Sequence, residues 1–354
     1  MSVQGLQGQP EAPGSAAIFT DGHIVDFPRL DLDQMSAAAA HWRMEQVQWG
    51  KGRLEASLKG IHTASLQLGL SGRSTGFFAH GDVPRDSIML AVLLRADHDF
   101  RYRGLLAQPA DIFTLRHGEE FEISTRRDSG IVTVAIDETL LERCFRSILG
   151  EPLGHWRQHE LLRMAQPRIA AFLPRFLAQC LEMGIGAIQG GDSAKLAWLE
   201  RSVITALVRS TGRPDIQASR AGRWHQAKFA EEYLRAHVDQ PISLPDLCEA
   251  VGVNERTLFL GFRERYGLSP KAYLKRLRLN HARRELLNAT PETTVTSVAT
   301  QWCFFQLGQF SAEYRSLFGE RPRDTLRNAL GGRPAAAIER VNAPEARSKS
   351  RTRE

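Results

Sequence analysis

The sequence predicts an α+β multidomain protein. A β-barrel occupies the N-terminal part, helices follow it, and an all-α C-terminal domain carries two helix-turn-helix motifs joined by a linker helix. Three observations support this prediction. Short runs of alternating apolar and polar residues occur within residues 18–150. Apolar residues then recur at helical spacing up to residue 211. Finally, one short helical pattern occurs twice between residues 244 and 322.

The alternating runs of the N-terminal part predict the strands of a barrel or sandwich. These runs are residues 47–49, 54–58, 61–68, 87–94, 111–115, 120–125 and 131–136. Turn residues separate them at 69–76, 104, 108–109, 117–118 and 128–130. A small barrel can enclose one small ligand among its inward side chains. Residues 1–17 are rich in Gly, Pro, Gln and Ser and are predicted to be disordered.

The helical region after the barrel is predicted to include residues 151–211. Apolar positions fit helices at 140–149, 169–181 and 196–208, with a loop from Gly184 to Asp192 between the last two. An apolar stripe outside a closed barrel needs a partner, so we expect this region to form a homodimer. The alternative is that the helices cap the barrel of a monomer. Residues 212–223 are polar and rich in breakers, and they are predicted to be a linker.

The repeated pattern predicts helix-turn-helix motifs at about 245–266 and 296–319. In the first copy, Ser243 and Asn254 can cap the two helices, and Gly252 suits the turn between them. Leu247 and Val298 occupy equivalent positions at an offset of 51. One copy alone would equally fit a pair of core helices. Two copies in register favour DNA binding, with the second helix of each in the major groove.

Residues 224–330 resemble the DNA-binding domain of AraC-type transcription regulators, the AraC/XylS family. The resemblance rests on Leu247, Ala250, Val251, Arg256-Thr257-Leu258, Phe262-Arg263, Gly267, Pro270, Leu277-Arg278-Leu279, Ala282-Arg283, Val298-Ala299, Phe304, Phe310, Tyr314-Arg315, Phe318-Gly319 and Pro322. It implies two units that read adjacent major grooves of double-stranded DNA. The phrase from Leu106 to Ile123 is similar to the cupin-like sensor barrel of the same regulators, so the predicted barrel is cupin-like.

The predicted contacts with DNA fall into two groups. The candidates for base reading are exposed positions of the second helix of each motif: Glu255, Arg256, Phe259, Leu260, Arg263, Gln306, Leu307, Gly308, Gln309 and Ala312. The candidates for phosphate contacts are Asn254, Thr257, Lys271, Lys275, Arg276, Ser311 and Arg315. Arg256 could bond guanine O6 and N7 together, and Gln309 could read adenine. Arg278 could instead pair within the protein.

Three residues depart from the pattern of the family. Phe259 and Leu260 stand where polar residues are usual, which predicts apolar contacts to thymine methyl groups or weak base reading. Cys303 replaces the usual glycine in the turn of the second motif, which leaves the geometry of that turn open. Neither departure removes the prediction of two reading helices.

Composition sets limits on other functions. The net charge of +6 permits a polyanionic partner, and the basic tail 331–354, predicted to be disordered, could add attraction to phosphates. The four cysteines are far apart and are expected to be reduced thiols of a cytoplasmic protein. No apolar run approaches the roughly 18 residues of a membrane helix, so no membrane partner is expected.

The competing class is a cupin-type metal-dependent enzyme, an oxygenase or isomerase with a helical appendage. A metal cupin needs clustered histidines, but His62, His80, His98 and His117 are scattered. We therefore expect no metal, no cofactor and no catalytic residues. The recurring arginines of the barrel, such as Arg95 and others up to Arg127, fit a solvated basic face, with an anion-binding fork as the alternative. The predicted function is a DNA-binding transcription regulator, an activator that responds to an unknown small-molecule effector, with RNA polymerase as a further candidate partner.

Overall fold

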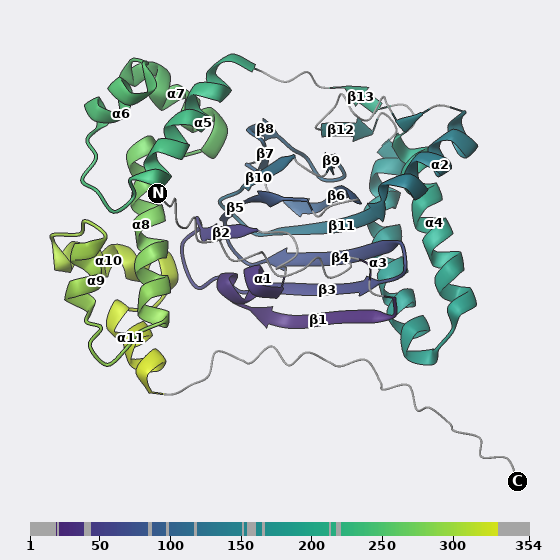
Figure 1. Cartoon of the computed structure of the whole chain (residues 1–354), viewed down its shortest axis with the longest axis horizontal. Coiled ribbons are helices and arrows are strands. Elements are labelled where there is room, and N and C mark those ends of the chain that lie inside the picture. The colour runs from purple at the N-terminus through teal and green to yellow at the C-terminus, as the bar shows by residue number, and fades with distance from the viewer. Residues whose placement is uncertain are drawn as a thin grey trace, which may run out of the picture.

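The computed structural model describes residues 19, 21–38, 44–83, 87–96, 99–116, 119–150, 152–153, 161–164, 167–211, 214–216 and 221–331. A region of two antiparallel sheets lies between two groups of helices (Figure 1). Helices α2, α3 and α4 lie at one end of the strands, and the C-terminal helical domain lies at the other. The segments 1–17 and 332–354, which include almost all of the predicted disordered ends, lie outside the described residues.

The larger sheet has the strand order β1-β3-β4-β11-β6-β9-β12-β13. Its strands are β1 (His23–Leu30), β3 (Ala56–His62), β4 (Leu66–Arg73), β6 (Ser87–Ala96), β9 (Ile112–Arg116), β11 (Ser129–Asp137), β12 (Leu161–Met164) and β13 (Pro214–Ile216). The smaller sheet has the order β2-β5-β10-β7-β8. Its strands are β2 (Glu45–Gln48), β5 (Phe77–Asp82), β7 (Arg101–Tyr102), β8 (Leu105–Leu106) and β10 (Glu120–Ser124). A short helix, α1 (Leu32–Ala38), follows β1.

The two sheets pack around an apolar core that includes Phe77, Met89, Phe100 and Phe113. The alternation of apolar residues therefore predicted most strands correctly, since one face of each strand is buried. The prediction missed β1, β5, β7, β8, β12, β13 and α1, whose sequences are short or alternate poorly. The predicted run 61–68 is wrong as a single strand, because it joins the end of β3 to the start of β4 across a turn. These are two sheets that pack face to face.

The turn predicted at residues 69–76 is wrong in its first part, because β4 continues to Arg73, and only residues 74–76 form the turn before β5. The glycines in this stretch allow close approach of neighbouring groups. A Cβ on Gly69 would lie 2.9 Å from Thr133 Oγ1, and one on Gly72 would lie 2.9 Å from Ser57 Oγ. Glycine within a strand can therefore mark tight packing as well as a turn.

Helices α2 (Glu138–Leu149), α3 (Pro167–Gly190) and α4 (Ser193–Thr211) confirm the helical periodicity. The loop predicted from Gly184 to Asp192 is shorter than expected, since α3 continues to Gly190 and only residues 191–192 separate it from α4. A Cβ on Gly184 would lie 2.3 Å from Ile61 Cδ1, so this glycine lets α3 pack closely on the sheet. By length and composition alone, Ala171–Gly190 could cross a membrane. Its buried Leu177 and Leu181 belong to the core under the sheet, which accounts for its apolar character.

The C-terminal domain contains α5 (Ala221–Ala236), α6 (Leu244–Val251), α7 (Glu255–Tyr266), α8 (Pro270–Leu287), α9 (Val295–Gln301), α10 (Leu307–Phe318) and α11 (Pro322–Leu330). Two apolar clusters hold the domain together. One includes residues of α5, α6, α7 and the first half of α8, and the other includes residues of the second half of α8 and of α9, α10 and α11. The predicted linker, 212–223, includes β13 and the start of α5. Only part of that segment is described.

The C-terminal domain packs directly on the smaller sheet. Val47, Trp49 and Phe78 of the sheet region belong to the same buried cluster as Tyr266 and Tyr273. The ring of Trp49 lies 5.0 Å from that of Tyr273 and 5.4 Å from that of Phe78. Such aromatic contacts bury large areas and favour one relative orientation. The two domains are therefore joined by a continuous core, and not only by the chain that connects them.

Candidate nucleic-acid interface

The first helix-turn-helix motif forms where the sequence predicts it. Ser243 caps α6 with a capping box shared with Asp246, and Gly252 ends the helix at φ 69°. Asn254 then caps α7 by accepting a hydrogen bond from the backbone N–H of Thr257 at 2.8 Å. Leu258 is buried in the cluster that holds α7 against α5 and α6. Local caps and a buried stripe therefore determine this motif.

The second motif has the same arrangement with a less usual turn. Thr294 caps α9, and Val298 is buried in the cluster below it. Cys303 adopts a left-handed backbone with φ 61°, which a glycine would adopt without strain. The turn thus forms with a cysteine in the backbone conformation that favours glycine. The Cys303 thiol lies 3.1 Å from the carbonyl oxygen of Asp239 and donates a hydrogen bond to it.

Helix α8 joins the two motifs. Ser269 caps it, Pro270 occupies its first turn, and its 18 residues span about 27 Å. This length approaches the roughly 34 Å that separates successive major grooves on one face of DNA. Because both apolar clusters include residues of α8, the helix fixes the spacing of the two reading helices.

All ten predicted base-reading residues are exposed. On α7, Arg256 and Arg263 lie on the side opposite the buried Leu258 and Phe262. The apolar candidates Phe259, Leu260 and Leu307 are also about 40% exposed, at 40%, 39% and 41%. Exposed large apolar side chains next to arginine can make apolar contacts with thymine methyl groups, and these contacts would remove them from water. Phe305, which precedes the N-cap residue of α10, is 72% exposed and was not among the predicted contacts.

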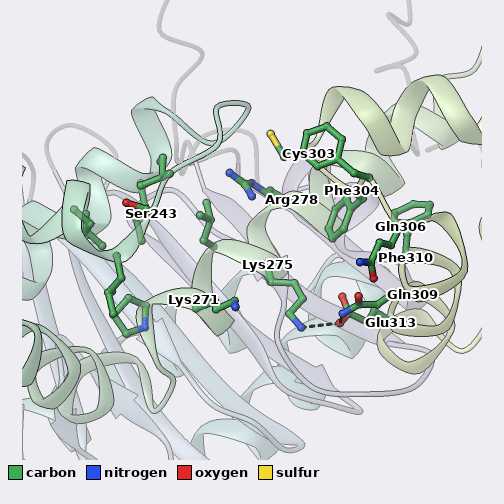
Figure 2. A pocket seen from close by; sticks show the side chains of 17 residues that line it. Ser243, Lys271, Lys275, Arg278, Cys303, Phe304, Gln306, Gln309, Phe310 and Glu313 are labelled. Carbon is green, nitrogen blue, oxygen red and sulfur yellow. Dashed lines mark hydrogen bonds and ion pairs between the residues drawn. The ribbon is translucent and has the colours of Figure 1, made fainter.

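A groove of about 620 Å³ separates the two motifs and crosses α8 (Figure 2). Figure 2 shows Lys271, Lys275 and Arg278 of α8 along it, opposite Gln309 and Glu313 of α10. Its rim also includes Ser243 at the start of α6. A basic groove between two reading helices has the charge needed to face a phosphate backbone.

Two of these side chains are held by an acid in the groove. Lys275 Nζ lies 2.7 Å from Glu313 Oε1, as the dashed line in Figure 2 shows, and Gln309 Nε2 donates to the same oxygen at 3.0 Å. Glu313 therefore orients the amide of the predicted adenine reader. A phosphate approaching Lys275 would compete with this ion pair. The anticipated internal role of Arg278 is confirmed, because its Nε donates to the Val238 carbonyl oxygen at 2.8 Å.

The remaining phosphate candidates divide by position. Asn254, Lys271 and Arg315 are exposed, whereas Thr257 and Ser311 are half-buried. Arg276 is the exception, because it does not face the groove. Its guanidinium donates to the carbonyl oxygen of Trp49 and lies 5.7 Å from the centre of that ring. Burial lowers the pKa of Arg276 to about 10. While the domains are in contact, this side chain cannot reach phosphate.

Buried polar groups join the C-terminal domain to the sheets. Arg265, 3% exposed, pairs with Glu122 of β10, and its Nε lies 3.1 Å from Glu122 Oε2. Asn280 accepts from the Gln48 backbone N–H at 2.7 Å and donates to the Gln48 carbonyl oxygen at 3.1 Å. This two-way contact imitates strand pairing and fixes α8 on β2. Sequence reasoning had no signal for it, since the partners lie 232 residues apart.

Glu45 of β2 has one histidine and two arginine partners at the same contact. It lies 2.9 Å from His80 Nε2, 2.8 Å from Arg235 Nη1 and 3.1 Å from Arg284 Nη1. The hydrogen bond with His80, followed by the two arginines, holds the pKa of Glu45 well below its ordinary value, against the opposing effect of burial. His80 therefore contacts a carboxylate within the smaller sheet, and His62 packs edge-on against His23 at 5.1 Å. His98 and His117 lie outside the described residues.

Comparison with known proteins gives matches to transcription regulators. A helix-turn-helix domain family model matches residues 247–328. A probable thc operon regulatory protein of Rhodococcus erythropolis is 39% identical over 101 residues, which cover 28% of this chain and 30% of that protein. XylDLEGF operon transcriptional activator 2 of Pseudomonas putida is 35% identical over 96 residues, which cover 27% of this chain and 61% of that protein. This chain therefore spans less than two thirds of the length of either relative.

Among solved structures, a probable AraC family transcriptional regulator from Rhodopseudomonas palustris is 40% identical to this chain. The match covers 30% of this chain and 97% of that one, with a TM-score of 0.29. The matched proteins are regulators, and none of those named here is an enzyme.

Proposed function

Because this chain belongs to the AraC/XylS family of helix-turn-helix transcription regulators, we propose that it binds a specific operator through both motifs and activates transcription in response to a small molecule. The observation that carries the proposal is the exposure of all ten predicted base-reading residues on α7, on α10 and directly before α10, two helices that pack in clusters shared with α8. Residues Arg256 and Gln309 would read guanine and adenine. Lys271 and Arg315 would contact phosphates and add no sequence preference.

Activation is the sign of regulation that we propose. The P. putida relative is itself a transcriptional activator, and an activator works through RNA polymerase, which is the further partner proposed here. The small molecule would be held between the two sheets, which enclose a cavity and would correspond to the cupin-like sensor barrel of the family. A protein with this task acts in the cytoplasm, where it meets DNA.

We also propose that the chain is a homodimer formed through α3 and α4. Phe172 of α3 is 58% exposed, and Trp198 of α4 is 48% exposed, although both helices are otherwise packed on the sheet. Large apolar side chains exposed in this way are typical of contact surfaces. Sedimentation equilibrium of the chain and of Trp198→Ser tests this. A chain that is monomeric at high micromolar concentration contradicts it, and the helices would then only cap the sheets.

The test of the main proposal is capture of genomic DNA fragments by the purified full-length chain at near-physiological salt. We expect a recurring site with two elements about one helical turn, roughly 10 base pairs, apart. The matched control is a double variant, Arg256→Ala with Gln309→Ala, which should retain weak uniform binding and lose the site. Binding by the wild type that is uniform in sequence and abolished by salt would refute sequence-specific reading.

A further inference from the structure

A cavity of about 230 Å³ lies between the two sheets of the N-terminal domain. Alternate residues of β4 line it, namely Gln67, Gly69, Ser71 and Arg73, as expected for one face of a strand. Further walls come from β1, β3, β6, β10, β11 and α1, and most of their contributing side chains are apolar. The cavity is thus a mainly apolar chamber with a few polar groups, which is the usual composition of a small-molecule site.

Two glycines leave room in the wall of this cavity. Gly60 of β3 and Gly69 of β4 lie opposite each other in the sheet and both line the cavity. Any side chain at these positions would occupy part of it. The volume is below the roughly 300–1,000 Å³ typical of sites for drug-sized ligands, so an occupant must be small.

Arg73 is the charged group of the cavity, and it is only 5% exposed. Its Nε and Nη2 donate to Gln46 Oε1 at 3.0 and 2.7 Å, and its Nη1 donates to Ser71 Oγ at 3.3 Å. The guanidinium also lies 4.1 Å from the centre of the Phe77 ring. These contacts are all with neutral groups. They use three of the five N–H donors of the guanidinium and leave one on each terminal nitrogen.

No carboxylate within the described part of the chain forms an ion pair with Arg73. Residues 39–43, which separate the lining residues Ala38 and Met44, contain no Asp or Glu. Removing a charge from water without a counter-ion is costly, and burial alone lowers the pKa of Arg73 to about 10. Arg265, buried to a similar extent, has Glu122 as its partner. Arg73 is therefore a buried cation whose counter-ion the described chain does not supply.

We propose that the cavity binds a small organic monocarboxylate, with the carboxylate on Arg73 and a compact apolar body between the sheets. The planar guanidinium matches a carboxylate, and its two remaining terminal N–H groups can each meet one oxygen. Gln46 and Ser71 hold the guanidinium in place and act as positioning residues. The glycine-lined wall accommodates the body of the ligand.

The position of Gln46 connects this site to the DNA-binding domain, and this step rests on the proposed function. The side chain of Gln46 accepts from Arg73, while its backbone carbonyl oxygen accepts from Arg284 Nη2 of α8 at 2.7 Å. Arg284 also contacts Asp33 of α1 at 3.1 Å, and α1 contributes Met35 to the cavity wall. The wall of the cavity thus lies against the helix that spaces the reading helices. Occupancy of the cavity should change operator affinity.

Isothermal titration of the full-length chain without DNA tests the ligand class directly. The probes are hexanoate and phenylacetate, each paired with its neutral amide, hexanamide or phenylacetamide. We expect at least one acid to bind, with its amide roughly 10- to 100-fold weaker, since charge-assisted hydrogen bonds are lost. Equal affinity of acid and amide, or no binding of either acid to the wild type, would overturn the proposal.

Two variants locate the site. Arg73→Gln should abolish the preference for the acid, and Arg73→Lys should restore part of it, because lysine keeps the charge without the fork. Ala91→Leu, which adds bulk to the cavity wall and leaves Arg73 unchanged, should weaken binding of the acid and its amide alike. Acid binding unchanged in Arg73→Gln would refute the site, whether or not the other variants fold.

Operator affinity is then measured with and without the acid that binds. A change that disappears in Gln46→Met supports the link to α8, and an acid that binds without altering operator affinity refutes that link. Operator binding by the ligand-free chain is a separate measurement. Failure of the ligand proposal is thereby distinguished from failure of the proposed function.

Discussion

The basic residues of α8 lie on two faces that differ in what they contact. On one face, Lys271 and Lys275 line the groove, and Glu313 of α10 forms an ion pair with Lys275. The other face is turned to the sheets, where Arg276 and Arg284 donate to backbone carbonyl oxygens of β2 and the residue after it. A run of lysine and arginine in a sequence is therefore not one DNA-binding surface. Each side chain must be assigned by its neighbours.

The largest expected effect concerns the buried ion pair between Arg265 of α7 and Glu122 of β10, at the same contact between the C-terminal domain and the sheets. Glu122→Gln leaves Arg265 buried without its counter-ion and should lower the free energy of unfolding by about 3–5 kcal/mol. Urea unfolding followed by tryptophan fluorescence measures this, since Trp49 is buried in the same contact. The control is Glu120→Gln, which removes an exposed pair with Lys228 and should cost under about 1 kcal/mol. Equal effects of the two variants would show that the domain contact does not depend on the buried pair.

The next effect concerns a base-reading candidate on the exposed side of α7. Arg256 is exposed at the start of α7, so Arg256→Ala should leave folding unchanged. It should cost about 1–3 kcal/mol at one base pair of the operator and relax the preference there. Competition binding with operators substituted at each position measures this. An unchanged base preference would remove Arg256 from the set of base readers.

A pH effect tests the contact of the C-terminal domain with β2 without altering the residues predicted to contact DNA. The pKa of Glu45 is lowered, first by its hydrogen bond with His80 and then by Arg235 and Arg284. A carboxyl group with a lowered pKa stabilises the fold above its unfolded pKa of about 4.5, and this contribution is lost as pH falls through the folded pKa. Stability should therefore decline below about pH 4.5, and less so in Glu45→Gln. Parallel profiles of the two proteins between pH 3 and 6 would contradict this role.

The smallest effect compares the two faces directly. Lys271→Ala removes a groove-facing cation and should reduce the slope of log affinity against log salt by about 0.9. Arg276→Ala should leave that slope unchanged as long as the domains remain in contact, because its guanidinium is bound to Trp49. Fluorescence anisotropy with operator DNA over a range of salt concentrations measures both. A slope reduced equally by both changes would show that the face of α8 turned to the sheets becomes accessible when DNA binds.

The accuracy of the sequence predictions follows the range of the interactions involved. Caps at Ser243, Asn254 and Ser269 are local, and each caps the predicted helix. Glycine was interpreted less well, because Gly69 and Gly184 serve close packing against residues distant in the sequence. The burial of Arg73 could not be predicted for the same reason. Arg73 lies in a stretch expected to be a turn, and its burial depends on Gln46 and Phe77 of the smaller sheet.

The two helix-turn-helix motifs, the helix that spaces them and the exposed positions on their second helices could be predicted from the sequence alone. Those features depend on caps and apolar spacing within a few residues, which are visible along the chain. Which arginines are exposed, which join the domains and which one lies in a cavity depends on the tertiary structure. Burial of a charge depends on strands and helices brought together from distant parts of the chain. Their pairing is set by the shape and charge of the whole core, and no local pattern records it.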